Sequence, residues 1–205
     1  MTTPKTPLNP TRLVEPRSKP KVALQSRGDL PHIYKEGCTY FVTFCLADAV
    51  PDRLRWREKI EKTDDPRNIA EHFDLNPAAG HCYLRRSELA SIVETAMLHF
   101  QGERYALSAW CVMPNHVHAV VTPFSGFTLS TILHSWKSYS AHEINKGLQK
   151  KGTVWIPESF DHLVRNERAF AQFVEYTENN PVVARLCGRP EEWPYSSARF
   201  RASRE

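Results

Sequence analysis

The stretch WCVMPNHVHAVVTP, residues 110–123, is apolar on both sides of a central Pro114–Asn115 pair. Pro and Asn favour turns, and Pro cannot donate to a sheet ladder. The stretch therefore predicts a strand over residues 104–113, a short turn, and a second strand over residues 116–121. Two histidines lie in the second strand, although buried polar groups cost free energy unless a partner satisfies them.

Other segments predict the elements around this hairpin. β-branched and aromatic residues over 39–47 predict another strand. Apolar residues at helical spacing predict three helices, over residues 87–101, 128–148 and 166–181. A short helix is also predicted over residues 54–62. This order of strands and helices predicts an α+β fold, with a mostly antiparallel sheet and helices packed on it.

Capping and helix-breaking residues predict where the helices begin and end. Ser87 and Asn166 are expected to start two of them, and Pro181 is expected to stop the last. Gly147 and Gly152 mark the expected end of the long helix. This helix is amphipathic, and its predicted buried face comprises Leu129, Ile132, Leu133, Trp136, Ser140 and Ile144.

The composition predicts one globular domain. The chain has 205 residues, of which 41% are apolar and 24% are charged, which is ordinary for a globular protein. No apolar run is long enough for a membrane span or a signal peptide, so a cytoplasmic protein is expected. The five cysteines are scattered without a C-x-x-C pair, which favours reduced thiols. The net charge of +4 permits a polyanionic partner without requiring one.

The paired histidines are candidate metal ligands. Side chains alternate faces along a strand, so His116 and His118 project from the same face, roughly 6–7 Å apart at the backbone. Neutral imidazole is a common ligand of divalent cations, although a tight site needs further oxygen ligands. The alternative is a pair of ordinary hydrogen-bonded histidines on a partly exposed strand.

A second candidate group lies in FVEYTENNP, residues 173–181. Tyr176 and Asn180 are four residues apart, which places them on one face of a continuous helix. A tyrosine hydroxyl can act as a covalent nucleophile, and an asparagine oxygen can bind a hard cation. Because Asn180 precedes a proline, Asn179 is an alternative ligand. The other interpretation is a surface tyrosine followed by a helix stop.

Several blocks of the sequence, taken together, resemble one known family. MPNHVHAVV resembles the signature of single-tyrosine HUH transposases, in which two histidines flank a hydrophobic residue. The blocks LPHIYKEGCTYFVTFCLAD, LHSWKSYSAHEINK, SFDHLVRNERAF, YTENNPVVARL and WPYSSA are similar, in the same order, to the branch called REP-associated tyrosine transposases. The resemblance covers about residues 27–200, without most of 48–80.

The resemblance implies a site and a substrate. It implies that Tyr176 is the nucleophile, that His116 and His118 bind the metal, and that Asn180 is the third, amide-bearing ligand. It further implies a ferredoxin-like HUH nuclease fold, Mg²⁺ or Mn²⁺ as cofactor, and single-stranded DNA with hairpin-forming palindromic repeats as substrate. One phosphodiester is exchanged for another ester, so no nucleotide cofactor is expected. No membrane partner is expected. Metal or a neighbouring base must help to ionise the tyrosine.

The expected domain layout follows from composition and from the blocks. Residues 1–27 are basic and Pro-rich and are expected to form a disordered or extended arm. Residues 28–205 are expected to form a single domain, with 48–80 a variable insertion and 181–205 a C-terminal extension. Related insertion-sequence transposases are dimers, whereas the REP-associated branch is often monomeric. Because the C-terminal extension could also cover a dimer surface, a monomer is favoured over a homodimer.

DNA contacts are expected from basic side chains, because phosphate contacts supply most nonspecific affinity. The alternative for each is a solvated charge. Trp136 and Trp193 could stack on bases, although core packing is the favoured role for both. The basic candidates are Lys137, which should point off the buried face of its helix, Arg165, Lys150, Lys151, Arg17, Lys19 and Lys21.

The sequence leads to three functional hypotheses. The first is a metal-dependent single-stranded DNA endonuclease and strand transferase that acts through a 5′-phosphotyrosine and can rejoin ends. The second is a hairpin-binding regulatory module that has lost transposition. The third is a plain metal-dependent hydrolase that uses the histidines with a water nucleophile.

Overall fold

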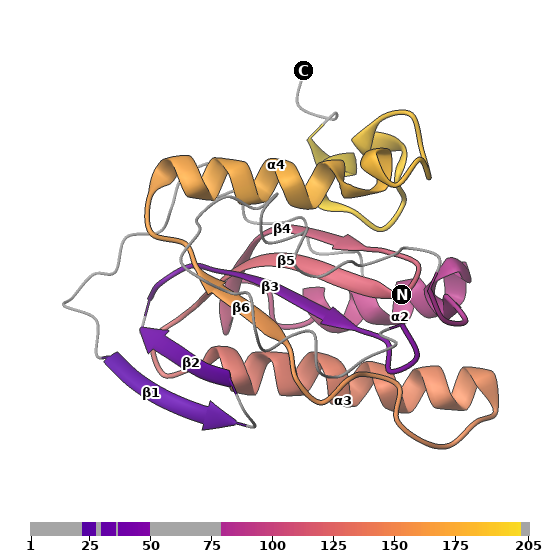
Figure 1. The fold of residues 1–205 in the computed structure, drawn as a ribbon, viewed down its shortest axis with the longest axis horizontal. Helices are drawn as coiled ribbons and strands as arrows, with labels where there is room; N and C mark the ends of the chain where they lie inside the picture. Colours follow the sequence, from indigo (N-terminus) through magenta and orange to yellow (C-terminus); the bar gives the residue numbers. More distant parts are fainter. Residues whose placement is uncertain (1–21, 28–29, 36, 50–78, 202–205) are drawn as a thin grey trace.

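The structure is a computed structural model, which describes residues 22–27, 30–35, 37–49 and 79–201. Its centre is a four-stranded sheet with the order β4-β5-β3-β6, in which all neighbouring strands are antiparallel. The strands span Tyr105–Val112 (β4), His116–Pro123 (β5), Tyr40–Cys45 (β3) and Phe160–Leu163 (β6). The predicted α+β class with an antiparallel sheet is therefore confirmed (Figure 1).

The predicted hairpin is formed by β4 and β5, with Pro114 and Asn115 in its turn. The backbone N–H of Met113 donates to the oxygen of His116 and closes the turn at 2.8 Å. All residues of β4 and β5 are buried. Strand β5 is an inner strand, because it pairs with β4 and with β3. Its nearly continuous apolar sequence is explained by packing on both faces of the sheet.

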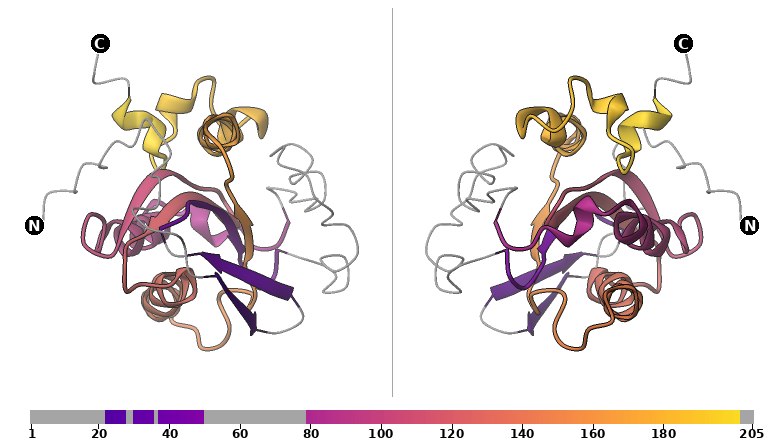
Figure 2. Two further views of the ribbon diagram at one scale, coloured as in Figure 1. Left: turned by 90° about the vertical axis from the view of Figure 1, so that its left-hand side faces the viewer. Right: turned by 90° about the vertical axis from the view of Figure 1, so that its right-hand side faces the viewer.

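Three helices cover the two faces of the sheet. Helix α4 (Glu167–Val183) lies on one face, and α3 (Leu129–Leu148) lies on the other, as two perpendicular views show (Figure 1, Figure 2). Helix α2 (Ser87–Leu98) packs against α3. Three short 3₁₀ helices, η1 (Tyr83–Arg85), η2 (Pro190–Glu192) and η3 (Ser197–Phe200), connect or follow these elements.

The helix ends agree with the predictions in part. The side chain of Asn166 accepts the Ala169 N–H at 2.8 Å, so it caps α4 as predicted. In contrast, Ser87 is the first residue of α2 and makes no cap, because Arg86 occupies the N-cap position. Gly147 lies inside α3, whose C-cap is Gln149 in a left-handed conformation with φ 53°.

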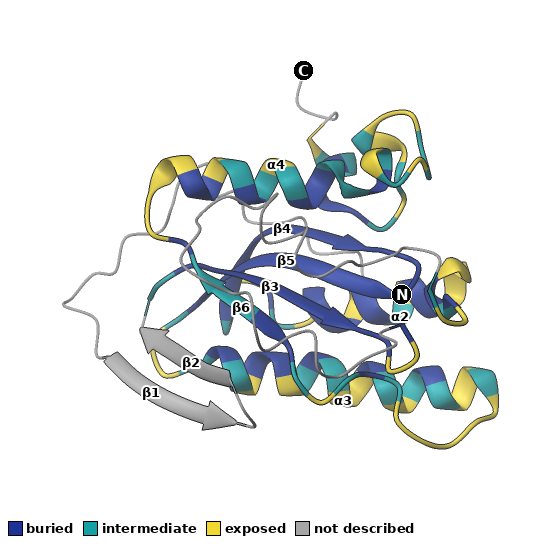
Figure 3. Cartoon of the chain, in the orientation of Figure 1, coloured by how far each residue is buried: buried dark blue, intermediate teal, exposed yellow. Residues whose placement is uncertain are grey.

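Among the described residues, the core forms two clusters, one on each face of the sheet. Strands β3, β4 and β5, which lie between them, are coloured as buried in Figure 3. The larger cluster joins the sheet to α2 and α3. It includes five apolar residues of α3, which are Leu129, Ile132, Leu133, Trp136 and Ile144. With Ser140, these are the buried residues of the helix. This is the set predicted from the apolar spacing. The smaller cluster joins the sheet to α4 and contains Phe41, Ala109, Val120, Phe160, Val164, Ala169, Phe170 and Phe173.

Some elements were not predicted. Strand β6 is only four residues long, and its sequence FDHL has no clear alternation. Strands β1 (Val22–Arg27) and β2 (Leu30–Lys35) form a separate antiparallel pair. The last six residues of the arm that was expected to be disordered or extended are a strand. The helix predicted over residues 54–62 lies outside the described residues.

The segment that follows α4 covers the outer edge of β4. The backbone N–H of Val112 donates to the backbone oxygen of Tyr195 at 2.9 Å. The Ser197 hydroxyl accepts the backbone N–H of Trp110 at 3.0 Å. Two ion pairs tie the same segment to the helices, from Arg199 to Glu94 of α2 and from Arg201 to Glu178 of α4. An edge that would otherwise offer unpaired backbone groups is thereby occupied.

Candidate functional site

The two histidines of β5 lie on the face of the sheet that α4 covers. His118 stacks on Phe41 of the smaller cluster, with ring centroids 5.6 Å apart. The Nε2 atoms of His116 and His118 are 3.1 Å apart, and both side chains are 2% exposed. The pair is thus buried, and its outer ring nitrogens converge on one point.

The inner ring nitrogens are each held by a neighbouring side chain. His116 Nδ1 lies 2.8 Å from Asn115 Oδ1, and His118 Nδ1 lies 2.8 Å from Thr43 Oγ1. The Asn115 amide is oriented by its nitrogen, which donates to the Ala79 oxygen at 2.8 Å. Its oxygen therefore faces His116 and can only accept, so His116 carries its proton on Nδ1 and a lone pair on Nε2.

The tautomer of His118 depends on what occupies the point between the rings. Its Nε2 can donate to the lone pair of His116, in which case the Thr43 hydroxyl donates to His118 Nδ1. Alternatively, His118 Nδ1 donates to Thr43, and both Nε2 lone pairs face the same point. The second arrangement fits a cation, because metal-bound histidines donate their other N–H to a neighbouring acceptor.

Burial keeps both imidazoles neutral. Desolvation lowers the pKa of His116 to about 3. Desolvation, together with the neighbouring His116, also lowers the pKa of His118 well below its ordinary value. Neutral imidazole is the form that binds metals. Among the described residues, no group of three or more His, Cys, Asp or Glu side chains is placed to hold a metal ion.

Helix α4 places Tyr176 against this pair. The ring centroids of Tyr176 and His118 are 5.3 Å apart, at an interplanar angle of 69°. Phe41 contacts the same tyrosine ring edge-on at 5.8 Å. Burial raises the pKa of Tyr176 to about 12, while a hydrogen bond with the Asn180 side chain acts in the opposite direction. The phenol therefore keeps its proton at neutral pH.

Asn180, rather than Asn179, is the amide that meets Tyr176. This follows because α4 continues to Val183 with Pro181 inside it, so the i, i+4 relation is kept. The prediction that Pro181 stops the helix is wrong. Proline removes one N–H and disfavours helical geometry before it, but here it is buried in the last turn, where tertiary packing holds the helix.

The basic residues predicted to bind DNA occupy different environments. The Lys137 amine does not point into solvent, because it donates to the Ile156 oxygen at 2.6 Å and the Pro157 oxygen at 2.9 Å. Burial lowers the pKa of Lys137 to about 8. Lys150, Lys151 and Arg165 are exposed. Arg17, Lys19 and Lys21 lie outside the described residues.

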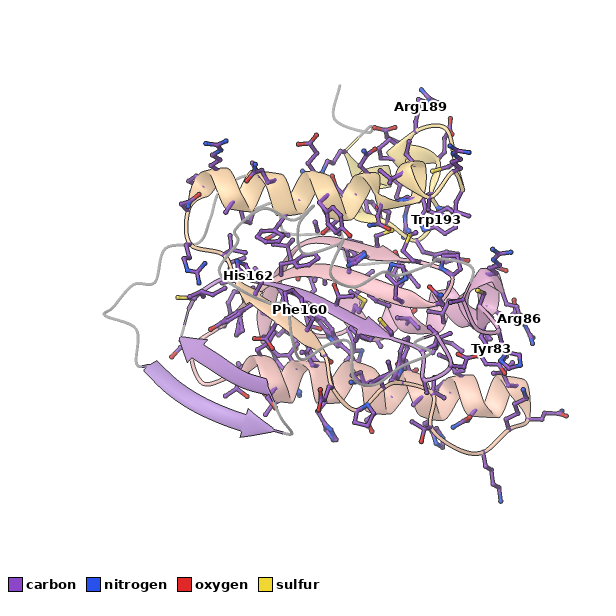
Figure 4. The ribbon with its side chains drawn as sticks, viewed as in Figure 1. Tyr83, Arg86, Phe160, His162, Arg189 and Trp193 are labelled. Carbon is purple, nitrogen blue, oxygen red and sulfur yellow. The ribbon has the colours of Figure 1, made fainter. Side chains whose placement is uncertain are left out.

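The two tryptophans have structural contacts. Trp136 is 1% exposed and belongs to the larger cluster, as expected from its spacing. Trp193 is half-buried beside the C-terminal turns (Figure 4), and its ring N–H donates to the Val112 oxygen at 2.9 Å. Both indole rings therefore take part in packing.

Sequence reasoning missed the partners of the histidines, which are Thr43 and Asn115. The signal for Asn115 was its place beside His116, but it was interpreted only as a turn residue. Thr43 is far away in sequence, and only the register of β3 against β5 places it opposite His118. Cys111 of β4 lies opposite the same histidine on the other side, and burial raises the pKa of its thiol well above the ordinary value.

The comparisons with known proteins agree on one family. The family model described as Transposase IS200 like matches residues 85–180, just under half of the chain. This range contains both histidines, Tyr176 and Asn180.

Among the described residues, no helix has the length and apolarity needed to cross a membrane.

Two curated relatives and one solved structure are similar to the chain. The REP-associated tyrosine transposase of Escherichia coli (strain K12) is 27% identical over 119 residues, which is 55% of this chain and 69% of that protein. The putative REP-associated tyrosine transposase of Haemophilus influenzae (strain ATCC 51907 / DSM 11121 / KW20 / Rd) is 24% identical over 121 residues, which is 54% of this chain and 67% of that protein.

The solved structure is that of the REP-associated tyrosine transposase bound to a REP hairpin. It matches with a TM-score of 0.60 and 19% identity over 87% of each chain, which shows that the fold is shared. Family model, curated relatives and fold thus agree with one another. Residues 85–180 thus match the model of the IS200-like transposase family, and the chain is similar to REP-associated tyrosine transposases.

Proposed function

We propose that this protein is a metal-dependent endonuclease and strand transferase for single-stranded DNA, with Tyr176 as nucleophile. The observation that carries the proposal is the position of the Tyr176 ring, 5.3 Å from the ring of His118. A covalent nucleophile needs to lie beside the group that activates or orients the reacting phosphate. A phenol on α4 and a pair of neutral imidazoles on β5 meet this requirement, although they are far apart in sequence.

The reaction exchanges one phosphate ester for another. The Tyr176 oxygen attacks the phosphorus of a phosphodiester, and the bond to the 3′-oxygen breaks. The phenol loses its proton, and the departing 3′-oxygen gains one. The products are a 5′-phosphotyrosine and a free 3′-hydroxyl, which can reverse the reaction or be replaced by another 3′-end. This reversibility accounts for both cleavage and rejoining without a nucleotide cofactor.

The residues around the phenol fit a divalent cation, Mg²⁺ or Mn²⁺. His116 and His118 would hold it through Nε2, since their Nδ1 atoms already have partners, and Asn180 would add its side-chain oxygen. The bound cation supplies Lewis-acid stabilisation of the charge that develops on the phosphate and on the leaving oxygen. Hydrogen bonding by Asn180 holds the phenol in place and favours its ionised form.

The proposed substrate is single-stranded DNA that carries hairpin-forming palindromic repeats. It is supported by the relationship to REP-associated tyrosine transposases, one of which was solved with a REP hairpin. A monomer is favoured, because residues 195–197 occupy the edge of β4 that another copy would need for strand pairing. A cytoplasmic location is proposed as well, on the basis of the similarity to the transposase family.

The test is covalent trapping on a hairpin oligonucleotide. The full chain is incubated with Mn²⁺ and a single-stranded oligonucleotide that carries a hairpin and labelled flanks, and the products are separated on a denaturing gel. Wild-type protein should form a shifted protein–DNA band. Tyr176→Phe should reduce this band at least 100-fold, while binding of the uncleaved hairpin stays within about twofold.

A matched control is Tyr139→Phe, which removes the hydroxyl of an exposed tyrosine on α3 and should leave the band unchanged. Wild-type nicking yield in Tyr176→Phe would contradict the proposal and favour a hydrolase with a water nucleophile. Tight hairpin binding by the wild type without any adduct in Mn²⁺ would instead indicate a regulatory binding module.

A further inference from the structure

A second group of aromatic and basic side chains, exposed or half-buried, lies beside the turn that precedes His116. Its members are His81, Tyr83 and Lys150, which we call the stacking platform. The rings of His81 and Tyr83 are nearly parallel, with an interplanar angle of 3° and a centroid distance of 5.0 Å. The Lys150 amine donates to the Tyr83 hydroxyl at 2.9 Å and lies 4.9 Å from the centre of the same ring.

Among the residues that the structure describes, His81 is exposed on the side away from Tyr83. Its side chain is 67% exposed, although one face of the ring lies against Tyr83. The ring is nevertheless fixed, because Nδ1 donates to Asp48 Oδ2 at 2.5 Å and the His81 backbone N–H donates to the same oxygen at 2.8 Å. A rigid, flat and exposed ring is a surface on which another ring can stack with little loss of entropy.

The backbone is shaped to hold this ring. Gly80 has φ +74°, and a Cβ atom at this position would lie only 2.7 Å from the backbone oxygen of Asp48. The close approach of residue 80 to Asp48 therefore requires glycine. It places the next residue, His81, within reach of the Asp48 carboxylate.

The platform is fastened to the proposed active site at two points. The Ala79 oxygen accepts the side-chain N–H of Asn115, and the Leu84 N–H donates to the Pro114 oxygen at 3.1 Å. Asn115 in turn holds His116. Tyr83 and Arg86 lie together at the end of the molecule where α3 terminates (Figure 4), in agreement with the contact between Tyr83 and Lys150.

Charges around the platform favour a polyanion. Asp48 and Glu88 are negative, but Asp48 is bound to His81, and Glu88 is bound to Arg86. Arg86 is used in the pair with Glu88, and three further positive side chains, Arg85, Lys150 and Lys151, lie in residues 83–88 and 150–151. Aromatic rings next to basic side chains are typical of surfaces that bind single-stranded nucleic acid, because bases stack and phosphates pair with the charges.

We propose that the stacking platform binds an unpaired nucleobase of the DNA strand that enters the active site, with the base on the outer face of His81 and Lys150 near the adjoining phosphate. This inference rests on the proposed function and extends it, since it names a contact for the single-stranded flank. The base becomes the third ring of the stack formed with Tyr83. A flank fixed in this way sets which phosphodiester reaches Tyr176.

The experiment measures binding separately from cleavage. The full chain is titrated in EDTA with a DNA hairpin that carries a single-stranded tail, in which 2-aminopurine replaces one tail base at a time. Wild-type protein should quench one tail position by stacking. His81→Ala should abolish this quenching and weaken binding about tenfold, whereas His81→Phe, which keeps a ring, should restore both.

Two controls separate stacking from charge. His142→Ala removes another exposed histidine, on α3, and should leave affinity and quenching unchanged. Lys150→Gln should lower the slope of log affinity against log salt by about one. Lys151→Gln, which alters the exposed neighbouring lysine, should lower this slope by less.

The outcomes distinguish this proposal from the function that it extends. If His81→Ala binds and quenches like wild type while wild type still forms the Tyr176 adduct, the platform proposal is overturned and the nuclease proposal stands. If quenching is lost in His81→Ala and regained in His81→Phe, and both variants melt at the wild-type temperature, the platform is supported. A wild type that does not bind the tailed hairpin at all overturns both proposals.

Discussion

The two faces of the four-stranded sheet differ in what they bury. The larger cluster lies between one face and helices α2 and α3, and its members are almost all apolar. The face under α4 covers a smaller cluster, and the buried imidazoles of His116 and His118 lie beside it. Polar groups on the first face, such as the Trp136 ring N–H, which donates to the Tyr105 hydroxyl, are paired inside the apolar packing. On the second face, the polar groups lie where α4 meets the sheet.

This difference suggests a division of roles. The large apolar contact with α2 and α3 holds the sheet together, since buried apolar area is the dominant stabilising term. The α4 face can then keep two neutral imidazoles that are costly to bury. Each imidazole has one nitrogen satisfied by a side chain of the sheet or the turn, and the other nitrogens converge.

The largest expected effect comes from emptying the larger cluster. Trp136→Ala should lower the free energy of unfolding by about 4 kcal/mol, because it leaves a cavity beside Phe44 and Tyr105. Urea unfolding followed by circular dichroism measures this change. Tyr139→Ala on the exposed side of the same helix should change it by less than about 0.5 kcal/mol. Equal losses in the two variants would contradict the assignment of α3 to the main core.

The α4 face should respond to acid. The pKa of His116 is about 3 in the folded protein, against an ordinary 6.5, so the unfolded chain binds more protons between these values. The free energy of unfolding should therefore fall as the pH drops below about 6.5, by about 2 kcal/mol at pH 5 for this group. Melting curves in EDTA between pH 8 and pH 5 test this.

His118 should add to this acid response, since its pKa is lowered as well. The matched variants are His116→Gln, which should flatten the dependence, and His142→Gln, which alters an exposed histidine and should not. A wild-type stability that stays constant down to pH 5 would show that the imidazoles are not buried neutral groups.

The smallest effect on stability is expected for Thr43→Val, which removes the hydroxyl beside His118 Nδ1 but keeps the shape. The free energy of unfolding should fall by about 1 kcal/mol. Affinity for Mn²⁺ should fall about 10-fold, because an outer-shell partner orients its metal ligand. Isothermal titration with Mn²⁺ and urea unfolding give the two values.

The control for this variant is Thr39→Val. Thr39 is also buried, and its hydroxyl bonds that of Thr122 at 2.7 Å, which is not a proposed ligand. It should cost similar stability and leave Mn²⁺ affinity unchanged. If both variants lowered Mn²⁺ affinity equally, Thr43 would have no particular role at the site.

The sequence predicted those parts of the fold whose signals are local. The Pro114–Asn115 turn and the buried face of α3 follow from turn chemistry and from apolar spacing, and both are confirmed. Strand β6 was missed because four residues with a mixed pattern carry too little signal. The effect of Pro181 was predicted wrongly, because a local helix-breaking tendency was outweighed by the packing of α4.

For the candidate site, the sequence by itself determined which groups are chemically able to act. Alternation along a strand placed the two histidines on one face, and a spacing of four placed Tyr176 beside Asn180. Only the tertiary structure decided that these pairs meet, that Thr43 and Asn115 hold the inner nitrogens, and that Lys137 is occupied by backbone oxygens. The physical reason is that spacing fixes directions within one element, whereas contacts between elements depend on strand register and on which helix covers which face.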